Sequence, residues 1–335
     1  MRRRPIGLIV ILVLGMLVLS LGAEAEQPGK VIRIGLLSPY APPADAEGRP
    51  SPLLDAVRHV LQERGCIEGQ HFTFEKRYAA GHYERLPALA AELAQLPVDV
   101  MIAFASPAAQ AAKGATRTIP IVFVNVSDPI GSGLVAHLAQ PGANVTGVAL
   151  LPTWEMVQKR LQLFREAVPQ VSRLAVLWNP ANPANATALR EVEQAAKALG
   201  VHLQALAVRD PTEVESAFHA ITAEQANGLF LHGDPVLDSQ NSRIAQFALA
   251  HHLPTMSPLR MWVEAGGLMA YGASNAHNFQ RAAALVDKIL QGTTPADLPV
   301  EQPMKFEFII NLKTAKELGL TIPATLLFQA DEIIR

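Results

Sequence analysis

The sequence is poor in cysteine and in aromatic residues. Cys66 is the only cysteine among 335 residues, and aromatic residues make up 6% of the chain. A single cysteine excludes an internal disulfide, and a catalytic thiol would need a base that the sequence does not identify. Half of the residues are hydrophobic, many of them alanine, which favours a helix-rich globular protein. The length exceeds one ordinary hydrophobic core and favours two lobes.

Clusters of basic residues are missing as well, apart from the first few positions. The formal net charge is −2 at pH 7, and beyond the N-terminus no stretch gathers lysine and arginine. Domains that bind nucleic acids usually carry a basic patch or stripe. We therefore expect no nucleic-acid partner.

The motifs of common enzyme classes are absent too. Gly131-Ser132-Gly133 lacks the G-x-S-x-G frame of a hydrolase nucleophile, and no glycine-rich dinucleotide fingerprint follows the first predicted strand. The ten histidines are scattered, and the adjacent His251 and His252 would diverge on a helix rather than form an i, i+4 metal pair. We expect no enzymatic activity, no catalytic residue, no cofactor and no bound metal.

The first 25 residues have the three parts of a signal peptide. Arg2-Arg3-Arg4 is basic, residues 6–22 are apolar, and Ala23-Glu24-Ala25 has the small-x-small form of a cleavage site. We expect residues 1–25 to be removed after Ala25, with an uncleaved membrane anchor as the alternative. Export without disulfides is typical of a periplasmic protein.

The stretch from residue 98 to residue 113 shows how the chain is organised. Residues 98–104 are predicted to form a strand buried on both faces, and residues 108–113 are helix formers. Ser106 stands where an N-cap belongs and Pro107 where the first helical residue belongs. The helix N-terminus beside the Ser106 hydroxyl would suit a carboxylate or phosphate. The alternative is that Ser106 only caps the helix.

The same strand-to-helix alternation runs along the chain in two series. In the first, strands are predicted at 31–37, 72–77, 98–104 and 119–124, with helices at 53–64, 83–96 and 108–113. Residues 131–147 are predicted to be a connector. In the second, helices are predicted at 153–168, with Thr153 as N-cap, and at 184–199, 211–225, 239–251 and 276–290, and strands at 173–178, 201–208, 228–231, 254–256 and 266–271.

This order predicts an α/β protein with two doubly wound parallel-sheet lobes joined by a hinge. Lobe 1 would comprise residues 31–148 plus about 273–300, and lobe 2 residues 149–272 plus about 301–335. Ligands of such sheets bind at the carboxyl ends of strands, where Ser38, Ser106 and the pair Ser127-Asp128 fall. Facing edges of the lobes would form a ligand cleft that closes by hinge motion, as in a bilobed solute receptor.

A set of short segments adds a resemblance to a known family. The segments are 81–90 (GHYERLPALA), 106–109 (SPAA), 119–123 (IPIVF), 127–131 (SDPIG), 141–147 (PGANVTG), 179–183 (NPANP), 265–272 (AGGLMAYG) and 306–316 (FEFIINLKTAK). Together they resemble the ABC-transporter substrate-binding proteins of the tryptophan/tyrosine-binding type, over essentially the whole chain after the signal peptide. The resemblance implies a type I periplasmic-binding fold.

The resemblance also implies ligand contacts from both lobes. Ser106 would hold a ligand carboxylate, and Asp234 would pair with an α-ammonium group. Supporting contacts are implied for Ser127, Asn179 and Asn182, and Tyr271 would line the cleft. For Asn179 and Asn182 the alternative is that they shape a turn, for Asp128 that it braces a loop, and for Tyr271 that it is packing.

The function implied by the resemblance is that of an extracytoplasmic receptor of an ABC importer. It would be a monomer that captures an amino acid or a related carboxylate and delivers it to an inner-membrane permease. The loop 38–52 is unusually rich in proline and acidic residues for this family, so we expect a small amino-acid-like solute rather than an aromatic one in particular. The alternative is a receptor that reports its ligand to a membrane signalling partner.

Overall fold

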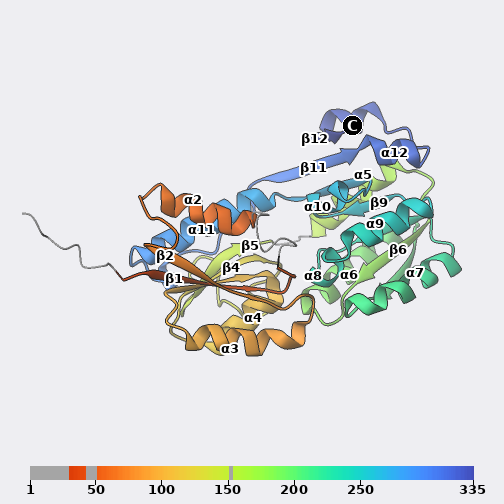
Figure 1. Ribbon diagram of the computed structural model, residues 1–335. Coiled ribbons are helices and arrows are strands. Elements are labelled where there is room, and N and C mark those ends of the chain that lie inside the picture. Colours follow the sequence, from red (N-terminus) through yellow and green to blue (C-terminus); the bar gives the residue numbers. More distant parts are fainter. Residues whose placement is uncertain (1–29, 43–50, 151–153) are drawn as a thin grey trace, which may run out of the picture.

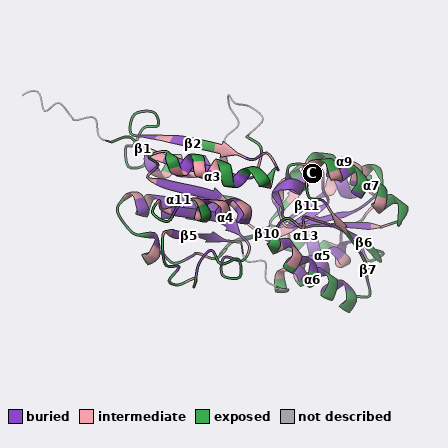
Figure 2. Ribbon diagram, turned by 90° about the horizontal axis from the view of Figure 1, so that it is seen from below, coloured by how far each residue is buried: buried purple, intermediate pink, exposed green. Residues whose placement is uncertain are grey.

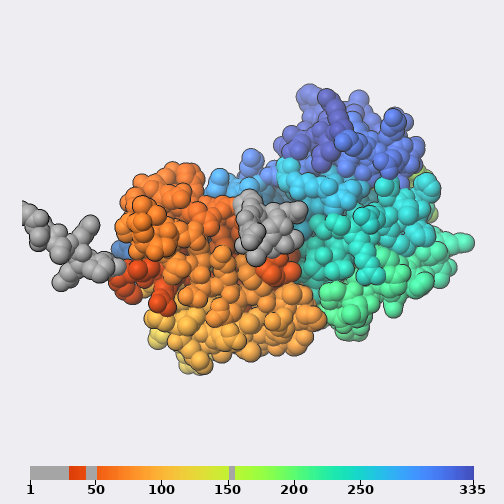
Figure 3. Space-filling model, viewed as in Figure 1, coloured from red at the N-terminus to blue at the C-terminus, as the bar shows by residue number. Residues whose placement is uncertain are grey.

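The computed structural model describes residues 30–42, 51–150 and 154–335, which form two α/β lobes side by side (Figure 1). The predicted signal peptide, the cap Thr153 and residues 43–50 of the proline-rich loop lie outside the described residues. We call the elements around the first sheet lobe 1 and those around the second sheet lobe 2. In the space-filling view the orange lobe 1 and the green-to-blue lobe 2 meet along a shared boundary (Figure 3).

Lobe 1 is built on a five-stranded parallel sheet in the order β2-β1-β3-β4-β5. Its strands are β1 (Ile32–Ser38), β2 (Phe72–Tyr78), β3 (Val100–Phe104), β4 (Ile121–Val126) and β5 (Val145–Ala149). Its helices are α2 (Pro52–Gln62), α3 (Leu86–Gln95) after the 3-10 turn η1 (Tyr83–Arg85), α4 (Ala105–Ala115) and α11 (Asn275–Leu290). Helices α2 and α11 pack on one face of the sheet, and α3 and α4 on the other. Strands covered on both faces explain the uninterrupted apolar runs in the sequence.

Strand β5 corrects the prediction that residues 131–147 are a connector only. Its five residues are interrupted by Gly147, which hides the strand pattern. The glycine is required because a Cβ atom there would lie 2.2 Å from the carbonyl oxygen of Phe123 on β4. The residue that lets β5 lie against β4 is thus the one that obscures β5 in the sequence.

Lobe 2 is built on a seven-stranded sheet in the order β12-β11-β10-β9-β8-β6-β7. The strands are β6 (Arg173–Trp178), β7 (His202–Ala207), β8 (Gly228–Leu231), β9 (Thr255–Ser257), β10 (Met269–Ala273), β11 (Phe306–Asn311) and β12 (Glu332–Ile334). The pairs are parallel as predicted, except that β10 and β11 are antiparallel. The exception arises because the chain leaves lobe 2 at the end of β10, visits lobe 1 and re-enters at the same edge of the sheet, where Ala273 pairs with Phe306.

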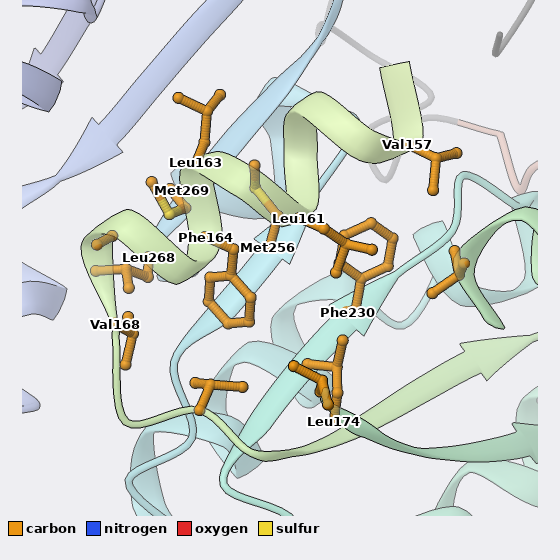
Figure 4. Packing of buried hydrophobic residues seen from close by; sticks show 14 of the residues in the cluster. Val157, Leu161, Leu163, Phe164, Val168, Leu174, Phe230, Met256, Leu268 and Met269 are labelled. Atoms are coloured by element: carbon orange, nitrogen blue, oxygen red, sulfur yellow. The ribbon is translucent and has the colours of Figure 1, made fainter. Parts of the chain in front are cut away.

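The helices of lobe 2 also cover both faces of their sheet. They are α5 (Trp154–Ala167), α6 (Pro183–Ala198), α7 (Val214–Ala223) after the 3-10 turn η2 (Pro211–Glu213), α8 (Pro235–Asp238), α9 (Asn241–Ala250), α10 (Arg260–Glu264), α12 (Leu312–Glu317) and α13 (Ala324–Gln329). In Figure 4, Leu161 and Phe164 of α5 lie over Phe230 and Met256 of the sheet, in the largest core cluster. Figure 2 shows buried strands in both lobes between helices that are exposed on their outer sides.

The chain passes between the lobes after β5, after β10 and again before β11. The 3-10 turn η3 (Pro295–Asp297) precedes the last of these passages. No helix in the described part of the chain has the length and apolar character needed to cross a membrane.

Candidate functional site

A cavity of about 720 Å³ lies between the two lobes, and we call it the main cavity. Lobe 1 contributes Ser106, Pro107, Gln110, Ser127, Asp128, Gly131 and Ser132, and lobe 2 contributes Ala181, Asn182, Pro183, Ala184, Thr187, Ala188 and Glu191. The first turns of α4 and α6 therefore border it from opposite sides. Two helix N-termini with free backbone N–H groups suit an anionic ligand group.

A smaller cavity of about 50 Å³ adjoins the main one, and we call it the inner cavity. The two share Ser127, Ala184 and Ala188 in their linings. The rest of the inner cavity is lined by Leu150, Met156, Arg160, Asn185, His232, Gly233, Pro258, Leu259, Tyr271, Gly272, Ala273 and Phe306. The site therefore has a wide part, whose lining holds most of the polar side chains, and a narrow part that contains Arg160 and His232.

Ser106 lines the main cavity but does not cap α4. The helix begins at Ala105, two residues before the predicted first helical residue Pro107, and Phe104 takes the N-cap position without a side-chain hydrogen bond. The prediction was wrong because Ala105 adopts a left-handed φ of 65°, which turns the chain from strand into helix without a separate cap residue. The Ser106 hydroxyl oxygen accepts a 3.3 Å hydrogen bond from the backbone N–H of Ser127. This bond ties the ends of β3 and β4 together beside the cavity.

Asp234 is fully buried and lines neither cavity. Its carboxylate accepts five hydrogen bonds, from the side-chain amides of Asn179 (3.0 Å), Asn182 (2.9 Å) and Asn185 (3.0 Å), the hydroxyl of Tyr83 (3.0 Å) and the backbone N–H of Val236 (3.0 Å). Burial raises the pKa of Asp234, and the bonds from the two asparagines at 182 and 179 oppose that rise. Protein donors already occupy both oxygens, so the predicted contact with a ligand ammonium group stays a prediction.

The asparagines around Asp234 hold the start of α6 in place. Asn182 is the N-cap of α6, accepts a 3.3 Å bond from the N–H of Ala184 and lines the main cavity. Asn179 accepts a 2.9 Å bond from the N–H of Ala181 and lines neither cavity. Both therefore shape the turn, and the predicted contact of Asn179 and Asn182 with a ligand stays a prediction. Asn185, which the sequence analysis missed, lines the inner cavity and is the third asparagine of the NPANPAN run.

Two tyrosine–aspartate hydrogen bonds join the lobes. Tyr83 of lobe 1 donates to Asp234, and Tyr40 of lobe 1 donates to Asp238 at 2.9 Å. Asp238 also accepts a 2.9 Å bond from the indole N–H of Trp262. Burial raises the pKa of Asp238 to about 7, and burial with the nearby aspartates raises the pKa of both tyrosines well above the ordinary value.

Ser38 belongs to this contact rather than to the cavity lining. Its hydroxyl oxygen accepts a 3.2 Å hydrogen bond from the N–H of Tyr40, and its side chain lines neither cavity. Tyr40 also stacks on Phe104, with ring centroids 5.2 Å apart. Ser38 and Phe104 thus hold Tyr40 toward lobe 2.

Asp128 and Tyr271 both face a cavity and both have a packing role. Asp128 accepts a 2.7 Å bond from the N–H of Gly131, which braces the loop after β4. A Cβ atom at Gly131 would lie 2.0 Å from a carboxylate oxygen of Asp128, so a larger residue there would displace the Asp128 side chain. Tyr271 lines the inner cavity and packs against Phe306 and Phe308, with centroid distances of 6.4 and 6.2 Å.

Three ionisable side chains at the cavities were not predicted. Arg160 of α5 is 4% exposed and His232 after β8 is 3% exposed, and both line the inner cavity. Glu191 of α6 lines the main cavity, and burial raises its pKa. A signal for Arg160 was present, since it lies on the apolar face of α5 at helical spacing from Val157 and Phe164. Among the described residues, no cluster of histidine, cysteine, aspartate and glutamate could hold a metal ion.

Comparison with known proteins gives the same picture of a binding protein. The chain is 24% identical to the tyrosine-binding protein of Clostridioides difficile (strain R20291), over 78% of this chain and 74% of that protein. A conserved domain protein of Vibrio cholerae has a similar structure, with a TM-score of 0.80 and 30% identity over 91% of this chain and 100% of the other. An ABC domain from Streptococcus pneumonia in complex with L-Trp reaches a TM-score of 0.81 at 25% identity, again over 91% and 100%.

The family model described as ABC transporter substrate binding protein matches residues 52–334. The two sheets, the cavity between them and the structural relatives agree with this match. The chain therefore belongs to the family of ABC transporter substrate-binding proteins, which are binding proteins and not enzymes.

Proposed function

We propose that this protein is the periplasmic receptor of an ABC importer and that it delivers a small amino-acid-like ligand to a membrane permease. The main support is the cavity between the lobes, which the starts of α4 and α6 border from opposite sides. The relatives support an amino acid as ligand, since one is a tyrosine-binding protein and another is in complex with L-Trp. Transport through the membrane would be the task of the permease.

The ligand carboxylate would bind at the start of α4, beside Ser106 and Ser127. Both line the main cavity, and the backbone N–H groups and dipole of α4 favour negative charge there. A ligand ammonium group needs a carboxylate that is open to the cavity, and Asp128 and Glu191 are the ones in the lining. Asp234 would contribute indirectly, because its carboxylate holds the side chains of Asn182 and Asn185 in position.

Ligand capture would occur by closure of lobe 1 (31–148 plus about 273–300) onto lobe 2 (149–272 plus about 301–335). The bonds of Tyr83 to Asp234 and Tyr40 to Asp238 would form on closure, because each joins the two lobes. A ligand that touches both lobes would shift the population toward the closed form. The permease would then recognise the closed form.

A thermal-shift screen of the purified protein against the twenty amino acids and small carboxylates tests this function. A ligand present at about a hundred times its Kd should raise the stability by roughly 2.7 kcal/mol. Small-angle scattering with and without a hit should show a decrease in the radius of gyration on binding. A screen with no hit among amino acids and carboxylates would contradict the proposed ligand class.

A further inference from the structure

We propose that the inner cavity receives an anionic group at the far end of the ligand and that Arg160 provides its counter-charge. The inference rests on the proposed function, because it concerns the same ligand. It adds that the ligand carries a second acidic group, such as a carboxylate, in addition to the carboxylate at the start of α4. His232 would make a second contact to that group.

Arg160 is a buried cation without a carboxylate partner. The only hydrogen bond of its guanidinium to a described residue is a long one of 3.4 Å, from Nε to the carbonyl oxygen of Met156. The guanidinium lies 5.5 Å from the centroid of the Phe230 ring, and no described carboxylate forms an ion pair with it. Burial lowers the pKa of Arg160 to about 10, so the side chain is still charged at neutral pH. Buried charges are normally paired, and the open side of this one is the inner cavity.

His232, which follows strand β8, also supports an anionic ligand group in the inner cavity. Its Nε2 atom is buried and has no hydrogen-bond partner among the described residues. Burial and the charge of Arg160 lower the pKa of His232 to about 3, so the ring is neutral and can donate one hydrogen bond. The guanidinium of Arg160 and an imidazole N–H of His232 can both donate hydrogen bonds to an acidic group of the ligand.

Glu191 does not neutralise Arg160. The nearby Glu191 raises the pKa of Arg160, but the two form no ion pair, and Oε2 of Glu191 is itself buried without a described partner. The two side chains open onto different cavities, Glu191 onto the main cavity and Arg160 onto the inner one. The site thus presents opposite charges at two separate places.

The size and lining of the inner cavity define the far end of the ligand. A volume of 50 Å³ holds roughly three to five water-sized groups at about 10–15 Å³ each, enough for a carboxylate. Met156, Leu259, Tyr271 and Phe306 give the lining an apolar character around the two donors. A flat apolar body that ends in an acidic group fits this arrangement.

Calorimetric binding of three matched probes tests the inference. The probes are L-phenylalanine, 4-carbamoyl-L-phenylalanine and 4-carboxy-L-phenylalanine, which share the amino-acid end and differ at the far end. We expect the carboxylate probe to bind about tenfold or more tightly than the neutral amide of the same shape. In Arg160→Met this preference of the carboxylate probe over the amide probe should disappear. Arg165→Met is the matched control, because Arg165 lies on the same helix as Arg160 but lines neither cavity, and it should keep the preference.

A ligand-free measurement guards against a variant that fails to fold. Removing an unpaired buried charge should leave the melting temperature of Arg160→Met equal to or above that of the wild type. If the carboxylate probe binds no better than the amide, or if Arg160→Met keeps the preference, the inference is overturned while the proposed function stands. If none of the three probes binds, the inference is overturned, and the thermal-shift screen against all amino acids decides separately on the proposed ligand class.

Discussion

The hydroxyl of Tyr83 in lobe 1 donates a 3.0 Å hydrogen bond to the buried carboxylate of Asp234 in lobe 2. The same carboxylate holds the three asparagines at the start of α6. One acidic side chain thus links the position of lobe 1 to the geometry of the main cavity. Substitutions of Tyr83 and Asp234 therefore test the proposed closure most directly.

Tyr83→Phe should weaken ligand binding roughly fivefold, because the closed form loses one hydrogen bond of about 1 kcal/mol. The hydroxyl does not line either cavity, so the effect would act through closure and not through ligand contact. Isothermal titration with a hit from the screen measures it. Tyr78→Phe is the control, because the hydroxyl of Tyr78 bonds to no described residue. Equal losses in both variants would argue against a closure contact at Tyr83.

Asp234→Asn should lower the free energy of unfolding by about 2 kcal/mol and weaken ligand binding. An asparagine presents an NH₂ group where amide donors now meet a carboxylate, so at least one donor becomes unsatisfied. Urea denaturation measures the stability. The control is Asp210→Asn at the N-cap of η2, where asparagine caps as well as aspartate does and little change is expected. Unchanged stability in Asp234→Asn would show that the five-bond arrangement is not important for the fold.

Asp238→Asn should gain stability relative to the wild type as the pH rises. The pKa of Asp238 is raised from 3.8 to about 7 in the folded protein, so its stabilising contribution is complete below pH 4 and is lost as the pH rises through about 7. The variant lacks this titration. Between pH 4 and pH 8, its free energy of unfolding relative to that of the wild type should rise by at most roughly 4 kcal/mol. Denaturation at a series of pH values measures it.

His232 acts in the opposite direction over the same range, and this makes the wild-type curve alone hard to interpret. Its folded pKa of about 3 lies below the ordinary 6.5, so its contribution is complete above pH 6.5 and is lost as the pH falls toward 3. Comparing Asp238→Asn with the wild type cancels the histidine. A difference curve that is flat from pH 4 to pH 8 would show that Asp238 does not titrate in this range.

Gly131→Ala should weaken ligand binding, with a loss of stability of about 1 kcal/mol. The new Cβ atom would lie 2.0 Å from the Asp128 carboxylate, so this side chain, which lines the main cavity, must turn away and lose its hydrogen bond to the N–H of residue 131. The control is Gly114→Ala on α4, which has free space around the new methyl group and should gain about 0.5–1 kcal/mol through helix propensity. Melting curves and titrations of both variants check this. Normal binding by Gly131→Ala would place the loop outside the ligand contact.

Much of the fold was predictable because each lobe repeats one local pattern. Apolar runs that end in Ser38, Ser106 and Ser127 mark buried strands, and right-handed crossovers then bring their ends to one edge. Strand β5 was missed because Gly147 breaks its pattern, and the antiparallel β10–β11 pair because the reversal depends on the path through lobe 1.

The site was less predictable because its contacts join distant segments. The pairs Tyr40–Asp238 and Tyr83–Asp234 link residues 198 and 151 positions apart, and no local pattern reports such contacts. Arg160 is an arginine on a helix, which is an exposed residue in most proteins, and its burial depends on the packing of α5. Ser106 was found for its hydroxyl at a strand end, although its role as a cap was wrong.

The late position of α11 in the chain governs the order in which the protein can fold during synthesis. Phe279, Ala282 and Val286 of this helix pack against Ile34 and Leu54 in the core of lobe 1. That core therefore stays incomplete until residue 290 has left the ribosome, by which time the residues of β6 to β10 of lobe 2 have already been synthesised. Lobe 1 starts first in the sequence, but its core includes a helix that is synthesised near the end. A nascent chain that is released before α11 has been synthesised therefore exposes an apolar face of the lobe 1 sheet.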